Sequence, residues 1–289
     1  MRYVTYQKEG APRLGAFTDN GIIDIQTLVP GAPATLRALI AADVSVRDQV
    51  AAAVATVDKE ACLPVADCLL LPPVTDPGKI ICLGLNYADH AKEGGHAIPD
   101  YPAMFLRCTT SMIGPNDPMI LPACSEQLDW EAELTIVIGK RCRHVKKSDA
   151  AEVIFGYTAM NDGSIREYQR KSAQWTAGKN FDGTGALGPC VVTADELPAA
   201  ASGLKIQTRL NGTVMQSSNT DQMIFDAFRT VEILSEIMTL EPGDLIAMGT
   251  PSGVGHARRP QVWMKAGDRV EVEIEKIGLL SNPIVAEQV

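Results

Sequence analysis

Long hydrophobic runs and paired cysteines are both scarce in this sequence. No stretch approaches the roughly 18 to 20 uninterrupted apolar residues that a membrane-spanning helix needs, and the N-terminal segment lacks the apolar core of a secretory signal peptide. The cysteines number seven, an odd count, and none forms a C-x-x-C pair. This argues against a disulfide framework and a zinc knuckle. We therefore expect a cytoplasmic protein with no membrane partner.

Basic residues are also in short supply. The chain carries 26 Lys and Arg against 35 Asp and Glu, a formal net charge of −9, which argues against nucleic acid or an anionic membrane surface as a partner. A basic run at residues 140–147 has no interleaved aromatic residues and is best explained as a solvated turn. A small anionic substrate stays compatible with this charge, because a local cationic pocket can form in an acidic protein.

The chain divides into two parts at a proline-rich break. Pro72 and Pro73 follow a segment that predicts short strands at 4–6, 13–17 and 22–25 and helices at 34–42 and 46–57. This segment carries no cluster of functional groups. We expect a small N-terminal domain at residues 1–72, without catalytic groups, and a larger domain at 73–289.

Several elements of the larger part follow from local patterns. Capping and apolar spacing predict a helix at 148–155, a polar helical stretch at 164–174 and an amphipathic helix at 226–240. The pair Asn211–Gly212 is a hairpin signal. Alternation of apolar and charged residues predicts a half-solvated strand at 267–275.

Two glutamates mark the stretch that we expect to organise the site. Glu131 and Glu133 are two residues apart at the start of an apolar, β-branched run, so both carboxylates project from one face of a strand. Buried like charges would repel each other unless a cation joins them, and hard oxygen ligands favour Mg²⁺, Mn²⁺ or Ca²⁺. Asp162, at the tip of a strand predicted at 156–163, would complete a set of three ligands. The alternative is an edge strand whose glutamates face water.

A second group of candidates supplies acid–base chemistry. His90 and Glu93 are three apart on a short predicted helix, so the carboxylate can orient the imidazole as a general base. Lys179, in a glycine-flanked setting, can meet the acidic cluster or an anionic substrate. The glycine loop at 249–255 can offer backbone N–H groups and the Thr250 hydroxyl to an oxyanion. The alternatives are an incidental surface pair and a surface lysine.

In combination, these motifs resemble the fumarylacetoacetate hydrolase family. The resemblance runs from about residue 78 to the C-terminus and rests on five motifs, GLNYADH at 84–90, DWEAEL at 129–134, GYT with ND at 156–162, PGD at 242–244 and GTPSGVG at 249–255. It implies an α+β, β-rich fold, a mixed β-sandwich roll with a small N-terminal α/β domain, and a homodimer.

The resemblance also implies roles for individual residues. The metal carboxylates of the family fall on Glu131, Glu133 and Asp162, and the family's dyad falls on His90 and Glu93. The metal-proximal lysine, the substrate glutamine and the loop threonine fall on Lys179, Gln169 and Thr250. Two features depart from the family pattern near the expected substrate pocket, an unusually glycine-rich stretch at 180–188 and Arg107 in place of a lysine.

The resemblance implies an enzyme of 2-oxo acid chemistry. The main expectation is a divalent-metal-dependent hydrolase that cleaves a C–C bond in 2,4-dioxo acids, with His90 activating water and Lys179 stabilising the oxyanion. The alternatives on the same enolate chemistry are decarboxylation of oxaloacetate-like acids and isomerisation of 2-hydroxymuconate-type dienoates. A non-catalytic binding protein on this fold is an alternative of another class, and a metal-dependent nuclease is disfavoured by the charge.

Overall fold

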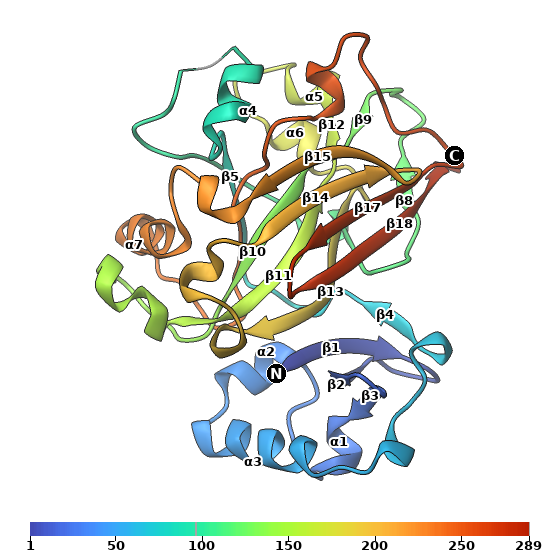
Figure 1. Cartoon of the computed structure of the whole chain (residues 1–289), viewed down its shortest axis with the longest axis vertical. Coiled ribbons are helices and arrows are strands. Elements are labelled where there is room, and N and C mark those ends of the chain that lie inside the picture. The colour runs from blue at the N-terminus through green and yellow to red at the C-terminus, as the bar shows by residue number, and fades with distance from the viewer. Residues whose placement is uncertain (96, 289) are drawn as a thin grey trace.

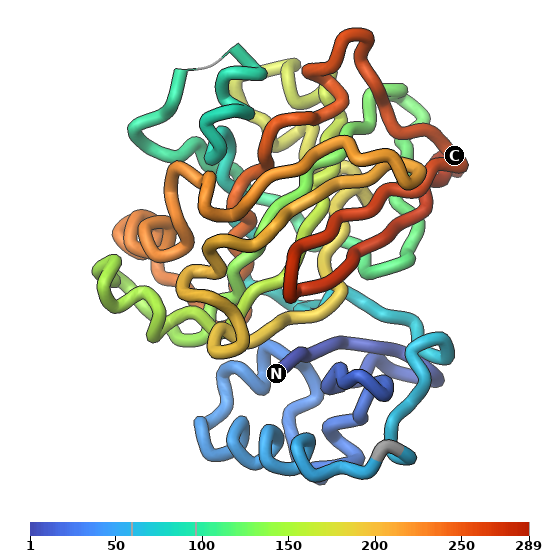
Figure 2. Tube along the Cα trace, in the orientation of Figure 1, coloured from blue at the N-terminus to red at the C-terminus, as the bar shows by residue number. Residues whose placement is uncertain are grey.

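The computed structural model describes residues 1–95 and 97–288. A larger part holds two β-sheets and most of the short helices, and a smaller N-terminal part lies below it in the view of Figure 1. The Cα trace in Figure 2 shows the N-terminus at the boundary between the two parts. No helix among the described residues is long and apolar enough to cross a membrane.

The central sheet provides the frame for the site. Its main path runs in the order β3-β2-β1-β13-β11-β10-β16-β5-β6, with β4 added to β1 and β7 added to β13. The sheet is mixed, because β16 pairs in parallel with β5 while β10 pairs antiparallel with both β11 and β16. Its strands in the larger part are β5 (Ile80–Gly84), β6 (Ala103–Leu106), β7 (Met112–Ile113), β10 (Ala132–Ile138), β11 (Ile154–Asp162), β13 (Gly185–Thr193) and β16 (Leu245–Ala247).

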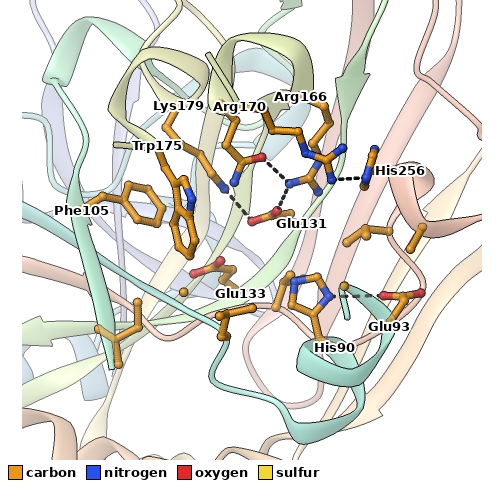
Figure 3. Close-up of a pocket in the computed structure, with 18 residues that line it drawn as sticks. His90, Glu93, Phe105, Glu131, Glu133, Arg166, Arg170, Trp175, Lys179 and His256 are labelled. Carbon is orange, nitrogen blue, oxygen red and sulfur yellow. Dashed lines mark hydrogen bonds and ion pairs between the residues drawn. The ribbon is translucent and has the colours of Figure 1, made fainter. Parts of the chain in front are cut away.

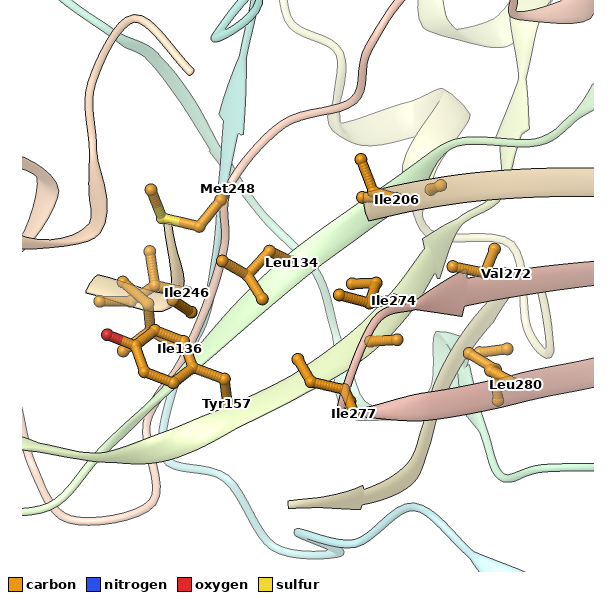
Figure 4. Close-up of a cluster of buried hydrophobic side chains, with 14 of the residues drawn as sticks. Leu134, Ile136, Tyr157, Ile206, Ile246, Met248, Val272, Ile274, Ile277 and Leu280 are labelled. Carbon is orange, nitrogen blue, oxygen red and sulfur yellow. The ribbon is translucent and has the colours of Figure 1, made fainter. Parts of the chain in front are cut away.

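A second sheet packs across the first. Its order is β15-β14-β17-β18-β8, and its strands are β8 (Met119–Leu121), β14 (Lys205–Leu210), β15 (Thr213–Asn219), β17 (Arg269–Ile274) and β18 (Gly278–Ala286). Buried and exposed residues alternate along β14 and β17, as expected for strands with one solvated face. Leu134, Ile206 and Ile274 are fully buried between the sheets, in the cluster that Figure 4 shows. The predicted β-sandwich is confirmed.

Short helices and turns connect these strands. The hairpin predicted at Asn211 and Gly212 joins β14 to β15, and both residues have positive φ, 50° and 79°. Asp226 caps the amphipathic helix through its side chain, and this helix is shorter than predicted. The helices of the larger part are α4 (Ala88–Glu93), α5 (Arg166–Gln169), α6 (Thr176–Lys179) and α7 (Ala227–Ile237).

Two helix predictions were only partly right. Residues predicted as a helix at 148–155 form a 3₁₀ helix at Lys147–Glu152, and the chain then enters β11 at Ile154. The apolar residues at the end of that segment are buried by the sheet rather than by a helix face. The polar stretch at 164–174 begins with the two-residue strand β12 (Ser164–Ile165), which pairs with β9 (Leu128–Asp129), continues as α5 and has no helix or strand at 170–174.

The N-terminal part contributes strands to the same central sheet. It contains β1 (Arg2–Gln7), β2 (Arg13–Thr18), β3 (Gly21–Asp24), β4 (Leu69–Leu71), α1 (Ile25–Leu28), α2 (Leu36–Ala41) and α3 (Val44–Ala55). β1 pairs with β13, so the hydrogen-bonded sheet continues across the predicted boundary. Leu39 and Ile40 share a buried cluster with Val137 and Leu245 on one face of the sheet. Division into domains at 1–72 and 73–289 stays a prediction.

Candidate metal and catalytic site

Three carboxylates converge where β10 and β11 lie side by side. Glu131 directly precedes β10, Glu133 lies within it, and Asp162 ends β11; the backbone N–H of Asp162 donates to the Glu131 carbonyl at 2.9 Å. One oxygen from each side chain lies within 4.8 Å of the others. The three residues are 5%, 1% and 0% exposed. The same-face prediction is confirmed, and the solvated edge strand is wrong because β10 has a neighbour on each side.

Two of these carboxylates are neutralised by buried cations. Nζ of Lys179 lies 2.7 Å from Oε2 of Glu131 and 2.6 Å from Oδ2 of Asp162. Nη1 of Arg166 lies 2.7 Å from Oε1 of Glu131. Burial alone would raise the pKa of Glu131, but the charges of Lys179 and Arg166 outweigh burial and lower it to about 2. Arg107 pairs with the other oxygen of Asp162.

Lys179 is therefore a cation and a hydrogen-bond donor rather than a base. Its side chain is 2% exposed, which excludes the surface-lysine alternative. Burial lowers the pKa of this ammonium, but the charges of Asp162 and Glu131 raise it by more, so the net shift is upward.

Glu133 differs from the other two carboxylates. Among the described residues it forms no salt bridge, and its Oε2 accepts one hydrogen bond, from the Gly249 N–H at 2.8 Å. Burial, with the charges of Asp162 and Glu131, raises its pKa well above the usual value. The cluster thus contains one carboxyl group that the protein's own cations leave uncompensated. A divalent cation bound by all three oxygen donors would supply that charge.

The His90–Glu93 pair faces the same pocket. Nδ1 of His90 lies 3.3 Å from Oε2 of Glu93, and the two side chains are 15% and 22% exposed. The oxygens of Glu93 also accept the Gly253 N–H at 2.9 and 3.2 Å, so the carboxylate is fixed between α4 and the glycine loop. The incidental surface pair is wrong, because both residues line the pocket with Glu131 and Glu133.

The glycine loop uses its backbone N–H groups differently from the sequence prediction. Gly249 donates to Glu133, Gly253 donates to Glu93, and the N–H groups of Gly255 and His256 donate to Asp129 at 2.7 and 2.9 Å. These four donors are engaged by carboxylates and are not available to an oxyanion, and the predicted oxyanion contact at Thr250 stays a prediction. The Thr250 side chain does line the pocket.

Two residues that hold the site in place were missed by sequence reasoning. Asp129, fully buried, binds the glycine loop and also accepts from Nε of Arg166 at 2.8 Å. Gln216 donates to the Thr250 hydroxyl at 2.8 Å and to the Pro251 carbonyl at 2.7 Å. Asp129 lies two residues before Glu131, and this spacing could have identified it as a residue of the site. Nothing in the sequence around Gln216 indicates its role.

The pocket has two different walls. It has a volume of about 210 Å³. In Figure 3, Phe105 and Trp175 lie on one side of Glu131, and Arg166 and His256 lie on the other. Arg170 also lines the pocket. Arg107, which the sequence analysis expected near the substrate pocket, instead pairs with Asp162, and both of these side chains are fully buried. Gln169 is in the lining, and its Oε1 accepts from Nη1 of Arg166 at 2.9 Å.

Comparisons with known proteins agree with this arrangement. The model of the fumarylacetoacetate (FAA) hydrolase C-terminal family matches residues 79–285. Oxaloacetate tautomerase FAHD2A, mitochondrial, of Bos taurus is 41% identical over 99% of this chain and 92% of its own length. The crystal structure of maleylpyruvate hydrolase from Sphingobium sp. SYK-6, in complex with manganese(II) and pyruvate, is 31% identical with a TM-score of 0.82, covering all of both chains.

A third relative adds an isomerase to these activities. The structure of 5-carboxymethyl-2-hydroxymuconate delta-isomerase from Mycobacterium smegmatis is 35% identical with a TM-score of 0.78, again over all of both chains. The sheets, the ordered motifs and the extent of these matches lead to one conclusion. This chain belongs to the fumarylacetoacetate hydrolase family.

Proposed function

We propose that this chain is a divalent-metal-dependent enzyme that interconverts the enol and keto forms of oxaloacetate-like 2-oxo acids. The observation that carries the proposal is a single pocket in which the metal-type carboxylates Glu131 and Glu133 face the His90–Glu93 pair. The 41% identity with a protein named oxaloacetate tautomerase supports the same reaction. Among the activities considered from sequence, this favours the isomerase and decarboxylase alternatives over hydrolysis.

The donor set suits a hard divalent cation. Glu131, Glu133 and Asp162 offer only oxygen, and Mg²⁺ or Mn²⁺, with Ca²⁺ as a further option, is the ion that such a set prefers. The manganese(II) in the maleylpyruvate hydrolase structure supports this choice. When bound, the cation supplies Lewis acidity to the 2-oxo group and to the negative charge that develops on it.

His90 is the residue that we assign to proton transfer. Its Nδ1 faces Glu93, which leaves Nε2 for the substrate. In the keto-to-enol direction, Nε2 takes a proton from C3, and the imidazolium returns that proton to the C2 oxygen through solvent; in the reverse direction the proton moves from the C2 oxygen back to C3 by the same route. The Glu93 carboxylate holds the ring and stabilises the imidazolium that this step forms.

The remaining polar residues orient the substrate and stabilise its charge. Lys179, held protonated by its two carboxylates, is placed to donate a hydrogen bond to the developing oxyanion. Gln169 and Thr250 line the pocket and are the groups that we assign to binding the substrate. The small volume of the pocket, about 210 Å³, favours an acid of few carbons over ligands that fill sites of roughly 300 to 1,000 Å³.

A second candidate is the hydrolytic cleavage of 2,4-dioxo acids. The His90–Glu93 pair is equally suited to activating water, and a hydrolase of this family is among the structural relatives. The two reactions differ in what His90 deprotonates, a C3–H bond in one and water in the other.

The proposed function is tested with enol oxaloacetate and an acylpyruvate as parallel substrates. With Mg²⁺ or Mn²⁺ we expect the protein to accelerate the loss of the enol absorbance in a stopped-flow spectrometer, and this acceleration should disappear with a chelator. Pyruvate release measured in the same samples reports decarboxylation or hydrolysis. Rapid acylpyruvate cleavage without enol–keto exchange would refute the proposal and establish the hydrolase.

Assembly and location stay proposals. We propose a homodimer, a small anionic 2-oxo acid as the partner and no nucleic acid partner; light scattering and a DNA mobility shift assay test the assembly and the nucleic acid. A cytoplasmic location is also a prediction, and the bovine relative carries the word mitochondrial in its name.

A further inference from the structure

One cation in the pocket has no carboxylate of its own. The two other arginine and lysine residues of the lining are paired, Lys179 with Glu131 and Asp162, and Arg166 with Asp129 and Glu131. Arg170 lines the same pocket, yet among residues 1–95 and 97–288 no salt bridge includes it. Instead, its Nη2 contacts Nε2 of His256.

The contact with His256 does not balance the charge of Arg170. An arginine side chain only donates hydrogen bonds, so Nε2 of a neutral His256 must accept. A neutral imidazole offers a lone pair but no negative charge. Burial and the nearby charge of Arg166 lower the pKa of Arg170, as expected for a guanidinium beside another cation.

Arg166 supplies a second, independent sign of a missing anion. The residue is 5% exposed, and its Nε and Nη1 are engaged by Asp129, Glu131 and Gln169. Its Nη2 is buried and has no hydrogen-bond partner among the described residues. A buried donor without a partner destabilises the free protein, so a ligand that satisfies it gains affinity.

The position of these groups sets the geometry of a bound substrate. Arg166 pairs with the metal-type carboxylate Glu131, and Figure 3 shows it on the same side of the pocket as His256, opposite Phe105 and Trp175. A ligand whose 2-oxo acid end lies at Glu131 and Glu133 therefore has a cationic wall on one side and an apolar wall on the other. An uncharged chain is suited to the apolar wall, and a second carboxylate to the cationic one.

We infer that Arg170, His256 and the free Nη2 of Arg166 form a subsite for the distal carboxylate of a four-carbon 2-oxo dicarboxylic acid. The inference rests on the proposed function, because it takes the other end of the substrate to lie at the three carboxylates. Arg170 gives charge-assisted hydrogen bonds, and His256 positions its guanidinium at the mouth of the pocket. The subsite makes Arg170 a specificity residue that distinguishes dicarboxylic from monocarboxylic 2-oxo acids.

The test compares the binding of two ligands to the Mn²⁺-loaded protein by calorimetry. The first is 3,3-difluoro-oxaloacetate, which has no C3 proton to lose, and the second is 2-oxobutyrate, in which a methyl group replaces the distal carboxylate. We expect Arg170→Gln to weaken the first ligand about 10- to 100-fold, as for a lost charge-assisted hydrogen bond, and to leave the second within about twofold. Arg170→Lys should restore part of the loss, and His256→Gln should give a smaller one.

Lys171→Gln is the matched control. It removes the same charge from the next residue, whose Nζ lies over the Tyr168 ring outside the pocket lining, and should change neither affinity. Equal weakening of both ligands by Arg170→Gln would overturn the inference, because Arg170 would then support the whole pocket. Unchanged binding of the dicarboxylate would overturn it as well.

Turnover separates this inference from the proposed function. If the parent protein binds the dicarboxylate through Arg170 but does not accelerate enol–keto exchange, the subsite stands and the tautomerase proposal fails. If exchange is rapid but Arg170→Gln leaves dicarboxylate binding intact, the tautomerase stands and the subsite fails.

Discussion

Replacement of Glu133 by glutamine should make the metal-free protein more stable and the metal-loaded protein less stable. Glu133 is 1% exposed, has no salt bridge among the described residues, and lies beside two ionised carboxylates. Glutamine keeps an oxygen that can accept the Gly249 N–H but carries no charge. The substitution therefore removes a buried ionisable group without removing its hydrogen bond.

The pH dependence of the unfolding free energy follows from the raised pKa of Glu133. The carboxyl has a raised pKa when folded, so the unfolded chain loses the proton first as pH rises. Stability is then lost above the unfolded pKa, by about 1.4 kcal/mol for each pH unit until the folded pKa is reached. The difference in unfolding free energy between Glu133→Gln and the parent should begin near pH 4.5 and increase with that slope. It should level off once the pH passes the pKa of Glu133 in the folded protein. For a chain of this length it corresponds to roughly 3 °C in melting temperature per pH unit.

The assay is thermal or urea unfolding from pH 4 to 8, once with a chelator and once with Mn²⁺. With Mn²⁺ at 100 times its dissociation constant, the parent should gain about 2.7 kcal/mol, and Glu133→Gln should gain little. Glu126→Gln, at an exposed position, is the control and should follow the parent in both series. A variant that is less stable than the parent with chelator at every pH, or that Mn²⁺ stabilises as strongly as the parent, would refute the reasoning.

Four other substitutions test the site and the N-terminal part of the structure. Glu131→Gln should destabilise the metal-free protein by about 3 to 5 kcal/mol, because the buried cations Lys179 and Arg166 each lose one of their two carboxylate partners, and equal stability in urea unfolding would contradict this. His90→Ala should lower the rate constant of enol–keto exchange by roughly 10² to 10⁴ while calorimetry shows unchanged Mn²⁺ affinity. Glu93→Gln should have a weaker effect. Full activity of His90→Ala would refute the assignment of His90 to proton transfer. Asp24→Asn should cost about 1 kcal/mol above pH 4 and little at lower pH. Burial opposes ionisation of Asp24, but hydrogen bonds from Arg13, Tyr6 and Thr27 outweigh burial and lower its pKa. Its contribution to the free energy of unfolding is therefore present above the unfolded pKa and is lost as pH falls. A loss of stability in Asp24→Asn that does not depend on pH would contradict this.

Local spacing in the sequence was enough to predict the central features of the site. An interval of two residues on a strand puts Glu131 and Glu133 on one face, and an interval of three on a helix brings His90 to Glu93. Both intervals are properties of the backbone repeat, so they hold wherever the element packs. The capping Asp226 and the hairpin pair Asn211 and Gly212 were predictable for the same reason.

Predictions failed where burial by distant segments overrode local pattern. Residues 148–155 have the spacing of a helix, but Ile154 belongs to β11, where strand pairing and the sheet's own core bury it. Distant segments also decide which N–H groups at residues 249–256 are available to an oxyanion. Carboxylates from α4, β9 and β10 occupy four of them, and the predicted contact at Thr250 stays a prediction.

The sequence by itself determined which residue types stand at short intervals, and hence the carboxylate pair, the dyad and the family's ordered motifs. Only the tertiary structure decided which charges compensate each other. Lys179 reaches Glu131 across 48 residues, Arg107 reaches Asp162 across 55, and Gln216 reaches Thr250 across 34. Those pairings depend on strand register and on how the loops cross the sheet. Among the described residues that line the pocket, they leave Glu133 and Arg170 without a salt bridge, because electrostatic interaction depends on distance in space rather than along the chain.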